Sequence, residues 1–453
     1  MTILIFIQLF ILSSYVSGGQ TSARLPPSND TFKKQIENIG NDQNINADST
    51  WNILSTWNKY PEVKNTKKWY LFLYKDSTFG TVPLKIFIPE NYQNNVASPA
   101  VLILHGAVVL SSFKDADKDT AADEDIFYNY FSTKNTIIIR PYADSYGPHA
   151  DGTINFDWVV NRFNGRNNRN KTNPTFQTLA NIISQIKQVL NIDDNKVYAL
   201  GHSDGADGVF ALDVYKPDLF AGFVVYNSML TSIFAHDVYL RNTLNRSLYL
   251  VHSDLDDLRP IQQTRLIMKT LDSLNSPVLY KEYIGYKHYD KHLQLDLPYS
   301  YEWMKGISRN PFTKSITWEL SDSTYNSCAW LQVAKFDTTI ESAKWQTELN
   351  AKLYNKRDKV YMDFLYYDLN KSGAVKAYYN NNIFDISTSR INEIILLISP
   401  VMVNLQNPVI VKINGKEVFN KTVSADKAFL IKDFASTFDR KALWVTSIKV
   451  KVN

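Results

Sequence analysis

One stretch of this sequence, residues 196–208, constrains the possible fold more than any other. It begins with the short apolar run 197–200, which is typical of a buried strand. Gly201-His202-Ser203-Asp204-Gly205 follows, and small residues and helix formers continue to Ala211. We therefore predict a strand, a sharp turn and a helix, with Ser203 at the apex of the turn. The glycines on either side allow a turn tight enough to expose the serine hydroxyl, and the helix start aims free N–H groups at the same place.

A serine in this position needs a base, because its hydroxyl is a poor nucleophile until a neighbouring group takes the proton. The chain has seven histidines. In a serine–acid–histidine chain order the base follows the last strand of the sheet. The predicted strand 278–284 runs into Gly285-Tyr286-Lys287-His288. We predict His288 as the base, with His292 as the competing candidate.

The acid is expected after the preceding strand, 247–251. Three carboxylates, Asp254, Asp256 and Asp257, crowd the loop that follows it. Asp256 fits best, because it lies a few residues past the strand and just before a helix opened by Pro260. Asp257 can instead be a charge at the helix N-terminus, and Asp254 can be a turn residue.

Two backbone N–H groups are expected to stabilise an oxyanion beside the serine. One belongs to Asp204, directly after the nucleophile. The other is expected after the apolar strand 100–104, where His105-Gly106-Ala107 follows; we predict Ala107, with Val108 as the alternative. A metal site built from histidines is the rival interpretation. The sequence has no H-E-x-x-H spacing, no phosphate-binding glycine loop and no nucleotide fingerprint, so we predict neither a metal nor a cofactor.

A length of 453 residues suggests two or three domains, and the pattern of predicted elements divides the chain into two regions. Strands and helices alternate before Pro311, which predicts a mostly parallel sheet covered on both faces. Further predicted strands in this region are 69–74, 82–89, 135–140 and 221–226, and predicted helices are 117–130, 174–190, 261–274 and 298–304. After Pro311 no long helical pattern remains, and the predicted strands are 316–320, 329–333, 360–367, 375–379, 393–398, 409–413, 429–431 and 445–452. We predict an α/β domain over 20–311 and a β-sandwich or jelly-roll domain over 312–453.

The N-terminus predicts export. Residues 3–12 form a short apolar run and residues 13–19 are small and polar, which is typical of a secretory signal peptide over residues 1–19, although residues 1–20 contain no Lys or Arg. About ten apolar residues are too few to span a bilayer, and no later stretch is long and apolar enough. The formal net charge of +4 is small and no dense basic run occurs, so nucleic acid is not an expected partner. The single cysteine, Cys328, excludes an intramolecular disulfide.

At these residues the sequence resembles the α/β-hydrolase superfamily. More narrowly, it is similar to secreted esterases of the polyhydroxybutyrate depolymerase and dienelactone hydrolase-like branch. The resemblance covers about half the chain. The motifs that carry it are, in chain order, Asp76-Ser77-Thr78-Phe79-Gly80, Leu104-His105-Gly106, residues 191–197, Gly201–Gly205 and Gly285–His288. It implies Ser203 as nucleophile, Asp256 as acid and His288 as base. Relatives often carry a longer glycine run after His-Gly, whereas Ala107-Val108-Val109 follows here. We expect these residues to determine the shape of the oxyanion hole and so the selectivity for the acyl group.

The sequence as a whole predicts a serine hydrolase that cleaves carboxylic esters through an acyl-enzyme. The expected partner is an ester substrate, with polymeric and glycan-linked esters among the candidates, and the sequence indicates no oligomeric state. The alternative is a prolyl-oligopeptidase-like peptidase, which would have the same fold but would cleave peptide bonds in small peptides instead of esters. A third hypothesis is an inert binding protein whose β domain docks a glycan or another polymer. Residues 144–173 are predicted to form a lid, with Phe156 and Trp158 either facing the acyl pocket or packing under a long loop. We also assign His202, beside the serine, to the substrate pocket.

Overall fold

The computed structural model describes residues 23–26, 29–107, 125–143, 156, 158, 174–229, 238–349, 351–355, 357–364 and 369–452. The predicted signal peptide, Val108 and most of the predicted lid lie outside the described residues.

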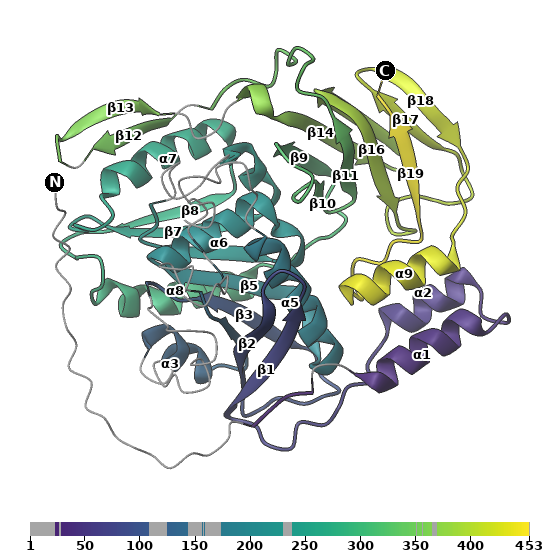
Figure 1. The fold of residues 1–453 in the computed structure, drawn as a ribbon, viewed down its shortest axis with the longest axis horizontal. Helices are drawn as coiled ribbons and strands as arrows, with labels where there is room; N and C mark the ends of the chain where they lie inside the picture. The colour runs from purple at the N-terminus through teal and green to yellow at the C-terminus, as the bar shows by residue number, and fades with distance from the viewer. Residues whose placement is uncertain are drawn as a thin grey trace.

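An eight-stranded sheet forms the centre of the molecule (Figure 1). Its order is β1-β2-β4-β3-β5-β6-β7-β8. Strand β2 pairs antiparallel with both of its neighbours, β1 and β4. All the other neighbouring pairs, from β4–β3 to β7–β8, are parallel. The predicted mostly parallel sheet is therefore confirmed. The strands are β1 Lys68–Asp76, β2 Gly80–Ile88, β3 Ser98–Leu104, β4 Ile137–Pro141, β5 Ile192–His202, β6 Gly222–Tyr226, β7 Ser247–Ser253 and β8 Val278–Tyr283.

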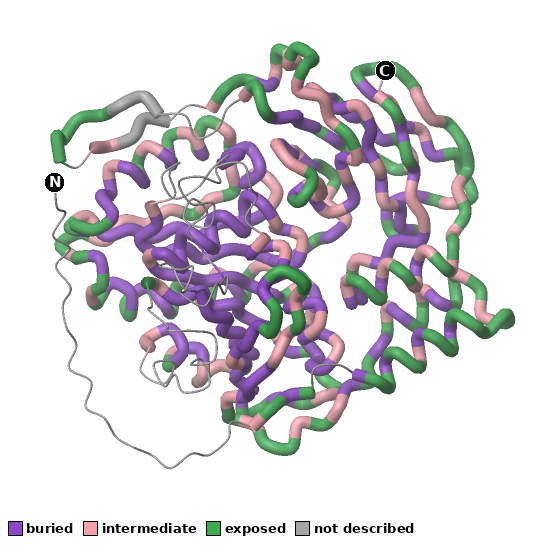
Figure 2. The backbone as a smooth tube through the Cα atoms, viewed as in Figure 1, coloured by how far each residue is buried: buried purple, intermediate pink, exposed green. Residues whose placement is uncertain are grey.

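The core of this region lies in two clusters, one on each face of the sheet. On β3, Ala100, Leu102 and Leu104 belong to one cluster, and Val101 and Ile103 belong to the other, because successive side chains of a strand point to opposite faces. Strands buried on both faces explain the continuous apolar runs in the sequence, and Figure 2 shows how much of the sheet is buried. The helices on the first face are α5 (Thr175–Val189), α6 (Asp204–Tyr215) and α7 (Ile261–Leu274); those on the second are α3 (Ile126–Ser132) and α8 (His292–Gly306).

Two of these helices differ from prediction at their starts. Helix α8 begins at His292 rather than at Pro298, which lies inside it. Helix α3 begins at Ile126, and Asp125 caps it by accepting the N–H groups of Phe127 and Tyr128; the earlier part of the predicted helix 117–130 is not among the described residues. Both starts lie near the carboxyl edge of the parallel strands. Short 3₁₀ helices, η3 (Pro217–Leu219) and η4 (Leu240–Asn245), lead into β6 and β7.

The C-terminal region contains two further sheets that share one buried cluster. One has the order β10-β11-β16-β19 and the other β18-β17-β15-β14-β9. Trp318 and Phe384 from the second sheet and Leu396 and Ile448 from the first belong to the same cluster, which supports the predicted sandwich. The strands are β9 Ser315–Leu320, β10 Ser327–Cys328, β11 Leu331–Phe336, β14 Gly373–Asn380, β15 Ile383–Ser389, β16 Ile391–Ile398, β17 Val409–Ile413, β18 Lys416–Lys421 and β19 Thr446–Lys451. A separate hairpin, β12 (Ala351–Asn355) and β13 (Val360–Phe364), precedes η5 (Leu369–Lys371).

One predicted strand in this region is wrong. Residues 429–431 lie in helix α9 (Lys427–Thr437), whose N-cap Asp426 accepts the N–H groups of Ala428 and Phe429. Helix α9 packs against two N-terminal helices, α1 (Asp30–Asn41) and α2 (Ala47–Ser55), although some 380 positions separate them (Figure 1). Leu430 and Phe434, one helical turn apart, are buried in the cluster that joins the three helices.

Buried ion pairs join the C-terminal region to the large sheet. Arg440 binds the Asp194 carboxylate of β5 at 2.6 Å, and Lys187 of α5 lies 2.9 Å from the same carboxylate. Arg309 binds Asp439 at 2.6 Å. Removing one partner of a buried pair leaves an uncompensated charge and is strongly destabilising. These ion pairs therefore bond the two regions to each other.

Candidate active site

Ser203 occupies the tight turn between β5 and α6. Its backbone has φ 59° and ψ −125°, a conformation that non-glycine residues rarely adopt. A Cβ on Gly201 would lie 2.3 Å from the carbonyl oxygen of Gly205, and a Cβ on Gly205 would lie 2.0 Å from that of Leu104. Only glycine fits at both positions, because these contacts are with backbone atoms. The predicted strand, turn and helix are confirmed, and the turn is held against the end of β3.

A chain of hydrogen bonds connects Ser203, His288 and Asp256. His288 Nε2 lies 2.8 Å from Ser203 Oγ, and His288 Nδ1 lies 2.7 Å from Asp256 Oδ2. Because a carboxylate only accepts, Nδ1 carries a proton, and Nε2 of the neutral ring accepts the serine hydroxyl. The three residues follow β5, β7 and β8, which are parallel strands whose carboxyl ends meet at one edge. This arrangement can deprotonate Ser203.

The Asp256 carboxylate is buried and accepts four hydrogen bonds. Oδ2 accepts from His288 and from the Asn227 amide at 2.7 Å, and Oδ1 accepts the backbone N–H groups of Leu258 at 3.0 Å and Arg259 at 2.7 Å. Burial alone would raise the pKa of this group, but the His288 proton, the Asn227 amide and the Arg259 N–H together lower it to about 2. Asp256 is therefore ionised at neutral pH and keeps the His288 proton on Nδ1.

The other carboxylates of the acid loop have different contacts. Asp254 Oδ1 accepts the N–H of Gly285 at 2.6 Å and so joins this loop to the one that carries His288. Asp257 is exposed. Of the three carboxylates considered from the sequence, only Asp256 is bonded to His288 in the structure.

Three further histidines surround His288. His202 Nε2 donates to the His288 carbonyl at 2.8 Å, and burial lowers the pKa of His202 to about 3. His252 Nε2 donates to the Arg259 carbonyl at 2.7 Å, and burial lowers its pKa to about 4. His292, the competing base, instead donates from Nε2 to Asn227 Oδ1 at 2.9 Å. These rings are neutral at pH 7 and hold the loops in place.

Asn227 and Arg259 are site residues that the sequence analysis missed. Asn227, directly after β6 with φ 53°, uses one amide group to bind Asp256, Ser253 Oγ and His292. The buried Arg259 guanidinium bridges the carboxylates of Asp204 and Asp207 on α6. The acid loop is thus bonded to the helix behind Ser203. The position of Asn227 after a predicted parallel strand was a usable signal, whereas nothing near Arg259 in the sequence indicated its partners.

The segment after β3 lies beside Ser203. A Cβ on Gly106 would lie 3.6 Å from Ser203 Cβ and 3.5 Å from the His202 carbonyl. His105 Nε2 accepts the N–H of Ala143 at 2.9 Å, so its Nδ1–H donates to the Gly106 carbonyl at 2.7 Å. These bonds position Gly106, and Ala107, which follows it, is exposed.

The remaining predicted pocket residues are buried. Phe156 and Trp158 have no exposed area and belong to the main core cluster. Phe156 packs edge-on against Phe79 with centroids 4.8 Å apart, and Trp158 packs against His105 at 5.6 Å. His202 is 7% exposed and stacks on Phe127 of α3. Trp158 thus packs against the loop after β3, and Phe156 packs against Phe79 and Trp158. Both contacts agree with the packing alternative for these rings.

Across the described ranges, no three His, Cys, Asp or Glu side chains gather in a way that could hold a metal ion. Among the helices that the structure describes, none has both the length and the apolar character needed to cross a membrane.

No protein-family model and no curated protein matches the sequence. Solved structures align with about half of it. A thermostable esterase covers 53% of this chain at 20% identity with a TM-score of 0.41, and the match spans 63% of that esterase, less than two thirds of its length. A fluorophosphonate-binding serine hydrolase of Staphylococcus aureus covers 52% at 14% identity and TM-score 0.38, over 97% of its own length. Dipeptidyl peptidase 4 of Porphyromonas gingivalis covers 54% at 12% identity and TM-score 0.41, over 36% of its own length.

Proposed function

We propose that this protein is a serine hydrolase that cleaves carboxylic esters through an acyl-enzyme. One observation carries the proposal: Ser203, on a turn with positive φ, is hydrogen-bonded to His288, and His288 is bonded to the buried, ionised Asp256. A nucleophile, a base and a group that orients the base are the three parts that such a reaction needs.

The proposed reaction has two halves. Ser203 Oγ attacks the ester carbonyl while His288 Nε2 takes its proton, and Asp256 stabilises the resulting imidazolium. The backbone N–H groups of Asp204 and Ala107 stabilise the oxyanion. His288 then gives the proton to the leaving alkoxide oxygen, the bond between that oxygen and the acyl carbon breaks, and the acyl group stays on Ser203. Water, activated by His288, releases the acid. No cofactor takes part in these steps.

Three features support a place in the α/β-hydrolase superfamily. The serine lies on a strand–turn–helix elbow, the order along the chain is serine, aspartate, histidine, and the loop after β3 lies beside the serine. The narrower proposal, an esterase similar to the polyhydroxybutyrate depolymerase and dienelactone hydrolase-like branch, rests on the sequence motifs alone.

A substrate panel tests the ester assignment. Purified protein is assayed on p-nitrophenyl esters of two to eight acyl carbons, and on aminoacyl p-nitroanilides, with Ser203→Ala as the control. We expect ester turnover that Ser203→Ala abolishes. Turnover of the anilides without ester turnover would support the peptidase, and a folded protein that hydrolyses neither would support an inert binding protein.

We also propose export through residues 1–19, supported by the apolar run 3–12. N-terminal sequencing of protein recovered outside the cytoplasm tests this. The mature chain is expected to begin after Gly18 or Gly19, and a chain that still begins at Met1 would contradict it.

A further inference from the structure

Arg259 contacts both halves of the candidate active site. Its backbone N–H donates to the Asp256 carboxylate at 2.7 Å. Its guanidinium binds the carboxylates of Asp204 and Asp207 on α6, and only 5% of the residue is exposed. Asp204 is also the residue whose backbone N–H is expected to stabilise the oxyanion. Arg259 therefore joins the acid to the helix start that carries the oxyanion donor.

The start of α6 has two opposing electrostatic effects on an oxyanion. The free N–H groups of a helix N-terminus favour a negative charge beside them. Asp204 and Asp207, in the first turn, place two carboxylates at the same end. These charges stabilise the helix itself, but they repel an oxyanion that forms beside Ser203. A cation that compensates the two carboxylates therefore favours the oxyanion.

Arg259 has the properties of this cation. Burial alone would lower its pKa, but Asp207 and Asp204 raise the pKa above its ordinary value, so the guanidinium stays charged. Asp204 is 5% exposed and Asp207 is fully buried, so salt screens these ion pairs little. The planar guanidinium donates to both carboxylates at once, whereas a lysine ammonium is a single point charge.

Hydrogen bonds on both sides fix the position of Arg259. Its carbonyl accepts from His252 Nε2 at 2.7 Å. Asp207 Oδ1 accepts the Ser228 hydroxyl at 2.7 Å and the Met229 N–H at 2.8 Å, while Asp207 Oδ2 binds the guanidinium. The two ends of the Arg259 side chain are thus held by different elements.

We propose that Arg259 is a positioning residue, which holds the oxyanion donor of α6 in place relative to the acid and neutralises the carboxylates beside that donor. The proposal rests on the esterase function proposed above and names a further residue on which its transition state depends. Arg259 acts through Asp204, whose N–H is expected to face the oxyanion, and through Asp256, which orients His288. Its loss should therefore lower kcat and change KM little, because the oxyanion exists only near the transition state.

The first test replaces the cation. Wild type, Arg259→Met and Arg259→Lys are assayed on p-nitrophenyl acetate, with thermal unfolding of each. Arg259→Met leaves two buried carboxylates uncompensated, and we expect kcat to fall about 100-fold, equivalent to about 2.7 kcal/mol. Arg259→Lys keeps the charge but cannot bind both carboxylates in the same way, and we expect a loss of about tenfold.

The second test separates charge compensation from packing by adding Asp204→Asn. In the wild type this substitution breaks the bond to Arg259 and is expected to lower kcat. In Arg259→Met it removes an uncompensated carboxylate beside the oxyanion, so we expect it to raise kcat by about tenfold. If Arg259→Met does not fold, the same comparison is made in Arg259→Lys, in which a carboxylate also lacks its full partner.

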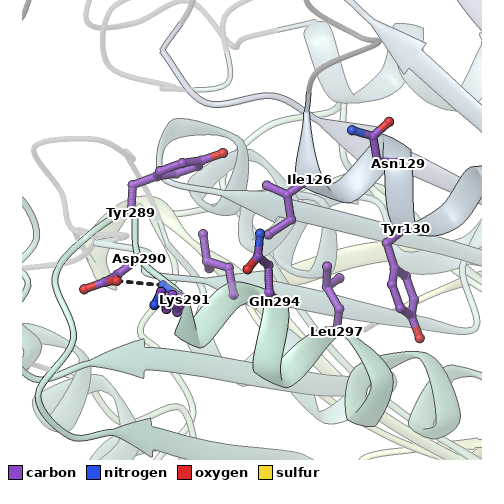
Figure 3. A pocket seen from close by; sticks show the side chains of 9 residues that line it. Ile126, Asn129, Tyr130, Tyr289, Asp290, Lys291, Gln294 and Leu297 are labelled. Carbon is purple, nitrogen blue, oxygen red and sulfur yellow. Dashed lines mark hydrogen bonds between the residues drawn. The ribbon is translucent and has the colours of Figure 1, made fainter.

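Two controls exclude general damage. Arg241→Met removes another buried arginine, 3% exposed, whose guanidinium binds Glu319; we expect it to lower the melting temperature and leave kcat unchanged. Gln294 is exposed on α8, six residues after His288, and lines a groove of about 550 Å³ between α3 and α8 (Figure 3). We expect Gln294→Ala to change neither kcat nor the melting temperature.

Four outcomes would contradict the role of Arg259. A kcat of Arg259→Met within about threefold of the wild type would overturn it, and so would a loss no larger than that of Arg241→Met. A change in KM at constant kcat would place Arg259 in substrate binding instead. If Asp204→Asn lowers kcat in both backgrounds, charge compensation is wrong. If the wild type hydrolysed no ester, the proposed function itself would fail, whereas an active wild type with an equally active Arg259→Met would contradict only the role of Arg259.

Discussion

Replacing Asp256 by Asn is a sharp test, because the structure defines what an amide would face there. Asp256 Oδ2 faces two donors, the Nδ1–H of His288 and the amide of Asn227, each at 2.7 Å. Oδ1 faces the backbone N–H groups of Leu258 and Arg259. A carboxylate accepts on both sides, whereas an amide must place its NH₂ group on one of them.

The less costly orientation of this amide inactivates the base. An NH₂ group on the Oδ1 side would face two backbone N–H groups, which can only donate and so cannot accept a hydrogen bond from it. On the Oδ2 side it would face His288, which can move its proton from Nδ1 to Nε2. The ring would then point an N–H at Ser203 Oγ, where an acceptor is needed. A histidine held in the wrong tautomer loses about 10⁴-fold in kcat. The amide would also face the Asn227 donor, and we expect a loss of about 1–3 kcal/mol in the free energy of unfolding.

The assay is steady-state hydrolysis of p-nitrophenyl acetate at pH 8 by the wild type and by Asp256→Asn, with thermal unfolding of each. Asp257→Asn is the matched control, because Asp257 is an exposed carboxylate on the same loop, and its kcat is expected to equal that of the wild type. We expect kcat of Asp256→Asn to fall by about 10³- to 10⁴-fold. A folded Asp256→Asn variant with more than about a tenth of the wild-type kcat would refute the assigned role of this carboxylate.

Three further predictions concern the residues around this site. Asn227→Gly keeps a residue that tolerates φ 53° but removes the amide bound to Asp256, so kcat is expected to fall about tenfold, since hydrogen bonds to charged groups contribute about 1.5–3 kcal/mol; an unchanged kcat would show that the amide has no positioning role. Gly205→Ala places a Cβ 2.0 Å from the Leu104 carbonyl and is expected to lower the free energy of unfolding by more than about 3 kcal/mol, measured by urea titration. Burial lowers the pKa of His252 to about 4, so its contribution to stability is present above its unfolded pKa of about 6.5 and is lost as the pH falls toward 4. His252→Gln should therefore flatten the decline in melting temperature between pH 7 and pH 4.

Two controls belong to these predictions. Gly306→Ala is matched to Gly205→Ala, because a Cβ on Gly306 would meet nothing within 4 Å; equal stability losses in the two variants would contradict the steric argument. If the melting temperature of His252→Gln declines as steeply as that of the wild type, the pH dependence arises from other groups.

The sequence predicted the large sheet well because its strands have a strong local signal. A strand such as β3 is buried on both faces and is therefore apolar at nearly every position. The elbow at Ser203 was also predictable, since its two glycines are required by backbone contacts that any such turn makes. The order of serine, acid and histidine then followed from the fact that parallel strands end at one edge of the sheet.

What could not be predicted depends on contacts between distant parts of the chain. Residues 429–431 resemble a short strand, and they are helical because Leu430 and Phe434 pack onto α1 and α2 at the other end of the sequence. Asn227 and Arg259 are polar residues in loops, and their roles come from partners on other elements. For the same reason the buried pair of Arg440 and Asp194 gave no signal, although it joins the two regions.

Identification of the residue that a fluorophosphonate labels tests the central claim most directly. The purified full-length protein is treated with the probe, digested and mapped by mass spectrometry, with His288→Ala treated in parallel. We predict a single adduct on Ser203, formed at a rate that falls by at least about 10³-fold in His288→Ala, because the hydroxyl then lacks its base. An adduct on another serine, or no adduct on folded protein, would contradict the assignment of Ser203 as the nucleophile.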